Sequence, residues 1–170
     1  MANILGFVGV GVSGLALLFA ILAMSLKYWE TSDQGGVADV NIGIWEYCIE
    51  TSGTKVCTTI DSDSVTDDEL RNYRGVRATV FLGILFTTGA IVSAILVLFI
   101  LTTKKVLYFV AAGLDVAAGL FLMIAMAVYA DKVAHDGYDF HASFALDIIA
   151  WLAAWAGGGI FVGAKLAEKE

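Results

Sequence analysis

The chain contains only two cysteines, Cys48 and Cys57, and both lie in one polar, acidic segment at about residues 27–77. Two cysteines in a single loop most simply form a disulfide. A zinc site would need further His, Cys or carboxylate ligands at suitable spacing, whereas His135 and His141 lie in a different segment. We therefore expect a disulfide, rather than a metal site or a catalytic thiol. Because a disulfide persists only in an oxidising compartment, this segment is expected to lie outside the cell or in a lumen.

No pattern of residues indicates an enzyme. The sequence shows no nucleotide-binding loop and no nucleophile beside a suitable base. The net charge of −7 lies almost entirely between the apolar stretches, and there is no basic patch to bind nucleic acid. We expect a protein without catalytic residues, cofactors, bound metal or nucleic-acid partners.

The composition indicates a membrane protein. Hydrophobic residues make up 59% of the 170 residues and charged residues only 16%, against roughly 45–50% and about 25% in soluble domains. The apolar residues form four runs long enough to cross the bilayer, which takes about 20 residues. We predict spans at about residues 4–26, 78–101, 106–130 and 143–164, with outer loops at about 27–77 and 131–142. The chain is then a single four-span domain whose first partner is the lipid bilayer.

The direction of the spans follows from the links between them. An even number of spans places both ends of the chain on one side of the membrane. The link at residues 102–105 is short and half lysine, and such links stay in the cytosol. The first span has no preceding Lys or Arg and is longer than the core of a signal peptide, so we expect it to be retained. With the cysteines, this predicts cytosolic termini.

The large loop contains a strand pattern around the cysteines. Residues 41–50 alternate roughly between apolar and polar types and include β-branched and aromatic side chains. Residues 51–54 have the composition of a turn, and residues 55–60 are typical of a second strand. The pattern predicts a β-hairpin closed by its own disulfide.

The residues around this hairpin resemble a known family signature. They are Trp29, Gly43, Ile44, Trp45, Cys48, Cys57 and Arg77. This set is similar to the W, GLW, C, C, R signature of the superfamily of claudins, peripheral myelin proteins and epithelial membrane proteins, with Ile44 in place of the usual Leu. The resemblance implies a membrane all-α four-helix bundle with a small extracellular antiparallel β-sheet that continues into the second outer loop.

The resemblance also implies roles for the signature residues. Trp29, Gly43, Ile44 and Trp45 would anchor the sheet to the outer ends of the helices, and Arg77 would pair nearby. Tryptophan suits that place because its ring favours the membrane interface and its N–H needs a polar partner. All five residues would be structural.

The function implied is that of a cell-cell junction or adhesion protein of the plasma membrane. Copies would contact one another laterally and across cells, and other four-span junction proteins are further candidate partners. PDZ scaffolds are not expected to bind the C-terminus, which ends in Glu168-Lys169-Glu170 without a hydrophobic last residue. Two alternatives are an adhesion and membrane-organising protein of the peripheral-myelin/epithelial type, and an auxiliary subunit of a channel or receptor.

Five carboxylates precede the second span: Asp61, Asp63, Asp67, Asp68 and Glu69. One interpretation is a solvated segment in which Thr66 or Ser64 caps a short helix with acids at its start. The other, by resemblance to pore-forming claudins, is that the acids line a path between cells and select cations.

Several polar residues near or within the spans have two interpretations. Asp115 lies in the middle of the third span, where it is either an ion or proton site or a hydrogen-bonded residue facing other helices, and we favour the second. Asp147 lies nearer the interface and is interpreted as a solvated or helix-start residue. His135 and His141 titrate near neutral pH and either make adhesion sensitive to pH or have no such role. Small residues in the spans are interpreted as close packing within the bundle.

Overall fold

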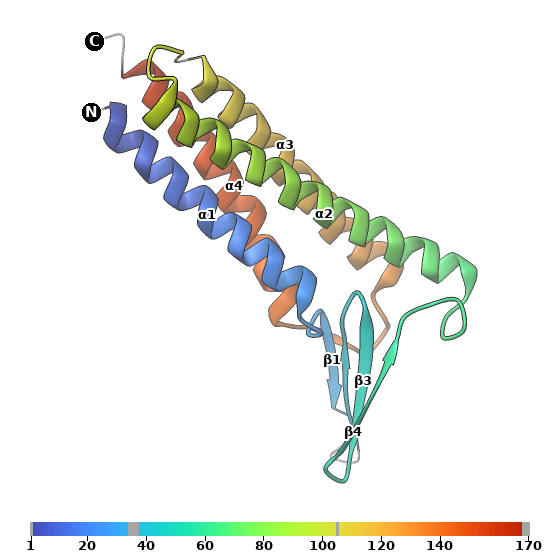
Figure 1. Ribbon diagram of the computed structural model, residues 1–170. Helices are drawn as coiled ribbons and strands as arrows, with labels where there is room; N and C mark the ends of the chain where they lie inside the picture. Colours follow the sequence, from blue (N-terminus) through green and yellow to red (C-terminus); the bar gives the residue numbers. More distant parts are fainter. Residues whose placement is uncertain (1, 34–37, 105, 168–170) are drawn as a thin grey trace.

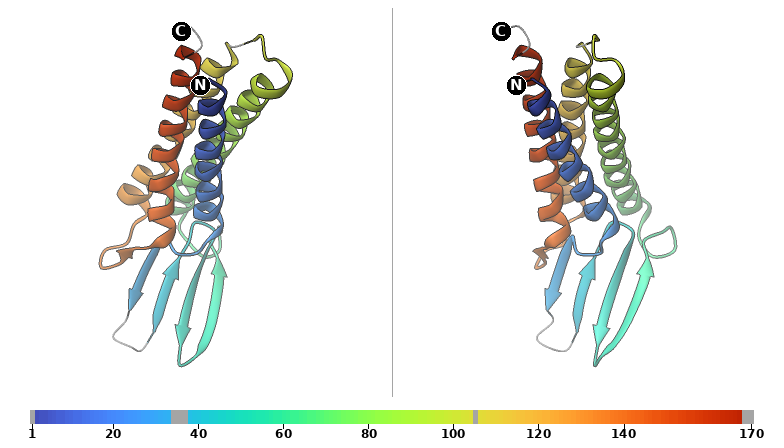
Figure 2. Two further views of the ribbon diagram at one scale, coloured as in Figure 1. Left: turned by 90° about the vertical axis from the view of Figure 1, so that its left-hand side faces the viewer. Right: turned by 60° about the vertical axis from the view of Figure 1, so that its left-hand side comes forward.

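The computed structural model describes residues 2–33, 38–104 and 106–167 of the chain. Four long helices form a bundle, and a β-sheet projects from one end of it (Figure 1). The helices are α1 (Ala2–Ser25), α2 (Asp67–Ile95), α3 (Leu107–Val128) and α4 (Ala142–Leu166). Helix α1 begins and α4 ends at the end of the bundle away from the sheet (Figure 2). Lys105 of the lysine-rich link and residues 168–170, on which the expectation about scaffolds rests, lie outside the described residues.

Four helical segments among the described residues are long and apolar enough to cross a membrane. They are Ile4–Ser25, Asp67–Ile100, Leu107–Val133 and Ala142–Leu166. Large apolar side chains, including Phe7, Phe81 and Phe109, are exposed on the outside of the bundle. Water would disfavour so large an apolar surface, whereas lipid accommodates it. The predicted membrane fold is confirmed.

Helix α2 begins well before the predicted second span. Thr66 is its N-cap: its Oγ1 accepts a hydrogen bond from the backbone N–H of Glu69, and the Glu69 carboxylate accepts one from the backbone N–H of Thr66 at 3.0 Å. This capping box satisfies two donors at the helix start. The predicted cap is present, but the helix is not short, because it continues without a break into the second span. A π-helical segment, η1 (Leu96–Ile100), extends it further.

The sheet combines strands from both loops. Its order is β4-β3-β2-β1-β5, and every neighbouring pair is antiparallel. The strands are β1 (Glu30–Asp33), β2 (Asp39–Ile42), β3 (Glu46–Thr51), β4 (Thr54–Thr59) and β5 (Asp139–Phe140). Strand β5 lies between α3 and α4 in sequence, after a π-helical segment η2 (Tyr129–Val133), and pairs with β1. The continuous two-loop sheet that the resemblance implied is therefore present.

The single strand predicted over residues 41–50 is wrong, because the structure divides it between β2 and β3. Residues 43–45 form a turn in which the Gly43 N–H donates to the Glu46 carbonyl at 2.9 Å. A Cβ at Gly43 would lie 2.7 Å from the Cα of Lys27, so glycine is needed for this close approach. Gly43 is the one turn-type residue among residues 43–45, which contain no Pro, Asn or Asp, so composition marks this turn only weakly.

A polar contact lies inside the bundle. The Ser13 hydroxyl donates to Asp115 Oδ2 at 2.6 Å, and both side chains are fully buried. Gly157 of α4 packs against this pair: a Cβ there would lie 2.5 Å from Ser13 Oγ and 2.9 Å from Asp115 Oδ2. Asp115 thus faces α1 and α4 rather than lipid, and the missing side chain at Gly157 makes room for its hydrogen bond.

The interpretation of Asp147 as a solvated residue is wrong. Its side chain is fully buried on the face of α4 that also carries Ser143 and Ala150. Helix α4 begins at Ala142, so Asp147 lies more than one turn inside the helix, where the 3.6-residue period directs it inward. Neither carboxylate oxygen has a hydrogen-bond partner among the described residues. A buried polar group without a partner is costly, so this position reduces stability.

The contact around Gly157 generates a stability prediction. Gly157→Ala should lower the free energy of unfolding by about 1–3 kcal/mol, because the new methyl group overpacks the Ser13–Asp115 pair. Gly159→Ala is the matched control, since a Cβ there meets nothing within 4 Å. It should be neutral or stabilising by up to about 1 kcal/mol, because alanine favours the helix over glycine. Equilibrium unfolding in mixed micelles measures both, and equal effects of the two substitutions would contradict the packing.

Candidate functional site: the disulfide-closed sheet and its attachment to the bundle

The hairpin β3–β4 carries both cysteines. Cys48 lies opposite Cys57 in the antiparallel register, and the two are joined by a disulfide, which confirms the prediction. The turn between the strands places Ser52 and Gly53 at positive φ, 52° and 78°. Positive φ at both central residues is the requirement of the type I′ turns that match the twist of antiparallel strands. The bond ties the edge strand β4 to the rest of the sheet.

Trp29 attaches the sheet to the bundle. Its indole N–H donates to the Ala23 carbonyl at the end of α1, at 2.7 Å. Its ring is fully buried and lies 4.6 Å, centroid to centroid, from that of Tyr129. Its backbone N–H donates to the Ile42 carbonyl, and its carbonyl accepts from the His141 N–H, both at 2.9 Å. One residue therefore connects α1, β2, the end of α3 and the second loop.

Arg77 of α2 holds the turn at the base of the sheet. Its Nε donates to the Ile44 carbonyl at 2.7 Å, and an Nη donates to the Ile60 carbonyl at 3.0 Å. Its guanidinium also lies 4.6 Å from the centre of the Trp45 ring, within the range of a cation–π contact. Ile44 is fully buried in the cluster that contains Trp29. Arg77 therefore pairs with backbone carbonyls and an aromatic ring.

The five carboxylates of residues 61–69 are all exposed, but their local roles differ. Asp61 Oδ1 accepts from the Asp63 backbone N–H at 3.1 Å, and Asp68 forms an ion pair with Arg71 at 3.0 Å. Asp67, Asp68 and Glu69 form the first turn of α2, where negative charge suits the helix dipole. Three of the acids therefore lie in the first turn of α2. The Asp63 carboxylate has no hydrogen-bond partner among the described residues.

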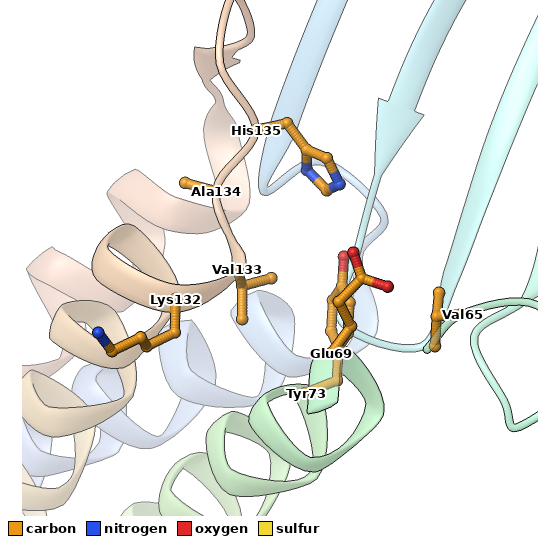
Figure 3. A pocket seen from close by; sticks show the side chains of 7 residues that line it. All are labelled: Val65, Glu69, Tyr73, Lys132, Val133, Ala134 and His135. Atoms are coloured by element: carbon orange, nitrogen blue, oxygen red, sulfur yellow. The ribbon is translucent and has the colours of Figure 1, made fainter. Parts of the chain in front are cut away.

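A cavity of about 160 Å³ lies between the start of α2 and the second loop. Its lining is Val65, Glu69, Tyr73, Lys132, Val133, Ala134 and His135 (Figure 3). Beside it, the buried carboxylate of Glu30 accepts hydrogen bonds from the backbone N–H of His135 at 3.2 Å and contacts its ring Nδ1 at 3.0 Å. Glu30 was not among the residues predicted from the sequence. The signal available was its position directly after the anchoring residue Trp29.

The grouping of Glu46 with Cys48 and Cys57 does not make a metal site. Their ligand atoms lie within 4.8 Å of one another. The two sulfurs, however, are bonded to each other, and Glu46 forms an ion pair with Lys27 at 2.8 Å. Metal binding to cysteine requires thiolates, which the disulfide removes.

Four membrane-spanning helices and a disulfide-closed sheet, which Trp29 and Arg77 fasten to the bundle, define a class of four-span membrane proteins with a small β-sheet outside the bundle. The sequence matches the model of the PMP-22/EMP/MP20/Claudin family over residues 1–162, and the chain belongs to this family. A search of curated proteins finds no match. Family membership makes the chain a junction-type membrane protein in the general sense, within a family whose members are structural rather than enzymatic.

The geometry of Arg77 generates a second prediction. Arg77→Lys should lower the free energy of unfolding by about 1–3 kcal/mol. A lysine ammonium group cannot bond both carbonyls and stack on the Trp45 ring at once, as the planar guanidinium does. Arg74→Lys, one turn away on the exposed side of α2, is the control and should change stability by no more than about 0.5 kcal/mol. Unfolding of the purified protein followed by tryptophan fluorescence measures the difference, and an Arg77→Lys variant as stable as the control would refute the contact.

Proposed function

We propose that this chain is a claudin-like cell-cell junction protein of the plasma membrane. Its sheet contacts partners from the same and the opposing cell, and forms or modulates a paracellular barrier or a cation-preferring path. The observation that carries the proposal is the disulfide-closed sheet, which projects beyond the bundle at the end away from the start of α1 and the end of α4 (Figures 1 and 2).

The sheet is proposed to face the extracellular space. Its disulfide requires an oxidising compartment. The link between η1 and α3 lies at the other end of the bundle and contributes Lys104, and lysine-rich links favour the cytosolic side. Both arguments support cytosolic termini and an extracellular sheet.

The free edge of the sheet supports a role in protein contacts. Strand β4 pairs only with β3 among the described residues, so the backbone groups of its outer side are available to another chain. Val56 on β4 and Ile49 opposite it on β3 are 61% and 40% exposed. An exposed apolar pair beside an open strand edge is a typical feature of a docking surface. Glu50 and Lys55, opposite each other in the next register, give this surface polar specificity.

The charge of the exposed end supports a preference for cations. The chain has a net charge of −7, and the exposed acids of residues 61–69 lie in the segment after β4 and in the first turn of α2. Carboxylates grouped on one surface raise the local concentration of cations and repel anions. In a confined space between two cells, such a surface would favour sodium over chloride.

Expression in an epithelial layer poor in claudins tests the proposal. The wild-type chain should change transepithelial resistance or the sodium/chloride dilution potential. A Cys48→Ser/Cys57→Ser variant should lose this effect, because removing a native disulfide typically costs about 2–5 kcal/mol in a small domain. Wild-type protein that reaches lateral membranes yet changes neither quantity would refute the barrier and pore proposals. It would favour an adhesion protein of the peripheral-myelin/epithelial type, or an auxiliary subunit that co-purifies with a larger partner.

A charge variant separates a pore from a barrier in the same layer. Asp61→Asn/Asp63→Asn removes two exposed charges, and an amide oxygen at position 61 can still accept the local backbone hydrogen bond. The variant should lower the sodium-to-chloride permeability ratio while junctional localisation stays unchanged. An unchanged ratio would exclude these carboxylates from the cation path.

A further inference from the structure

We infer that Glu30 and His135 form a proton-dependent latch that fastens the second loop to the sheet. Glu30 is the first residue of β1, whereas His135 follows η2 at the end of the third span. The short β1–β5 ladder and the backbone hydrogen bond from the His141 N–H to the Trp29 carbonyl also join these two segments. The latch concerns how the surface is held together, so it does not depend on which partner the surface contacts.

The Glu30 carboxylate is buried and contacts both the backbone and the ring of His135. The Glu30 side chain is only 1% exposed, and each of its oxygens is engaged by His135: Oε1 by the backbone N–H at 3.2 Å and Oε2 by ring Nδ1 at 3.0 Å. The His135 ring remains 43% exposed, so protons from the solvent reach it. A buried carboxylate that depends on one half-exposed imidazole for its countercharge is destabilised when that imidazole becomes neutral.

The groups around His135 reinforce its positive form. Glu69, from the first turn of α2, faces the same cavity as the His135 ring in Figure 3. Tyr73 of α2 and Lys132 of η2 also line this cavity, and in Figure 3 the Lys132 ammonium points away from His135. Tyr138 of the second loop lies with its ring 5.5 Å from that of His135. Tyr47 of β3 lines the neighbouring cavity that His135 also borders. The charged groups aimed at the imidazole are therefore carboxylates.

The direction of the pH effect follows from this arrangement. The hydrogen bond to Glu30 raises the pKa of His135 above its ordinary value of 6.5, partial burial opposes this, and the charges of Glu30 and Glu69 add to the rise. A raised pKa in the folded state means that the stabilisation is fully present below pH 6.5 and is lost as the pH rises through the higher, folded-state value. Acidification toward pH 6 should tighten the latch, and mild alkalinity should loosen it.

The chain supplies a matched control for this inference. His141 is the only other histidine, and it lies in the same loop, directly before α4. Its ring packs at 5.7 Å from that of Tyr28, and among the described residues its side chain forms no ion pair with a carboxylate. His141→Gln therefore removes a histidine from the same loop without removing the proposed latch.

Two measurements on the full chain in lipid nanodiscs test the latch. The first is an NMR titration of protein labelled only at histidine, with His141→Gln used to assign the two signals. His135 should titrate above pH 6.5, and Glu30→Gln should lower its midpoint. A His135 midpoint at or below 6.5 in the wild type, or a midpoint that Glu30→Gln leaves unchanged, would overturn the inference.

The second measurement is the thermal midpoint of unfolding at pH 6 and pH 8. The wild type and His141→Gln should both lose stability between pH 6 and pH 8 relative to His135→Gln, which lacks the titrating ring but retains a side chain able to donate to Glu30. If His135→Gln shows the same pH dependence as the wild type, the latch does not exist. This comparison remains decisive even if Glu30→Gln fails to fold. It is also independent of junction assays, so its failure is distinguishable from failure of the proposed function.

Discussion

The contacts of Trp29 join four parts of the molecule that lie far apart in sequence. The indole N–H satisfies a carbonyl at the end of α1, where the helix leaves orphan acceptors. The Trp29 backbone forms hydrogen bonds to β2 and to the residue before α4. Its ring packs against Tyr129 and Phe144. The direction in which the sheet leaves the bundle depends on this residue. Arg77 complements it from α2 by holding the carbonyls of Ile44 and Ile60.

The bundle beneath the sheet packs by means of small residues and a few buried polar groups. In lipid, helices gain little from hydrophobic burial, so close contact and internal hydrogen bonds become more important. Gly157 accommodates the Ser13–Asp115 pair, and Gly119 accommodates the Trp155 ring. Asp147 is an exception, because its buried carboxylate has no hydrogen-bond partner among the described residues. The sheet is therefore attached to a bundle that combines close helix packing at its glycines with a few buried polar side chains.

The sequence predicts features that depend on long or strongly typed patterns. Four apolar runs predict the helices, two cysteines in one loop predict the disulfide, and the spacing of Trp29, Gly43 and the cysteines indicates the family. Features that depend on contacts between distant segments are not accessible in this way. The break between β2 and β3 is set by the approach of Lys27 to Gly43, and the burial of Asp147 by the rotation of α4. The role of Glu30 was not predicted for the same reason, since its partner His135 is more than a hundred residues away in sequence.

The claim on which the proposed function depends is that the sheet lies outside the cell. Ser52→Asn creates an Asn-x-Thr glycosylation acceptor with Gly53 and Thr54 in the exposed hairpin turn, and Asn tolerates the positive φ of this position. Ser62→Asn creates a second, independent acceptor with Ser64, between β4 and α2. Expression of each variant in mammalian cells, followed by glycosidase treatment, reads the orientation directly. A glycan on the folded protein is the predicted result; two folded, membrane-inserted variants without any glycan would contradict an extracellular sheet.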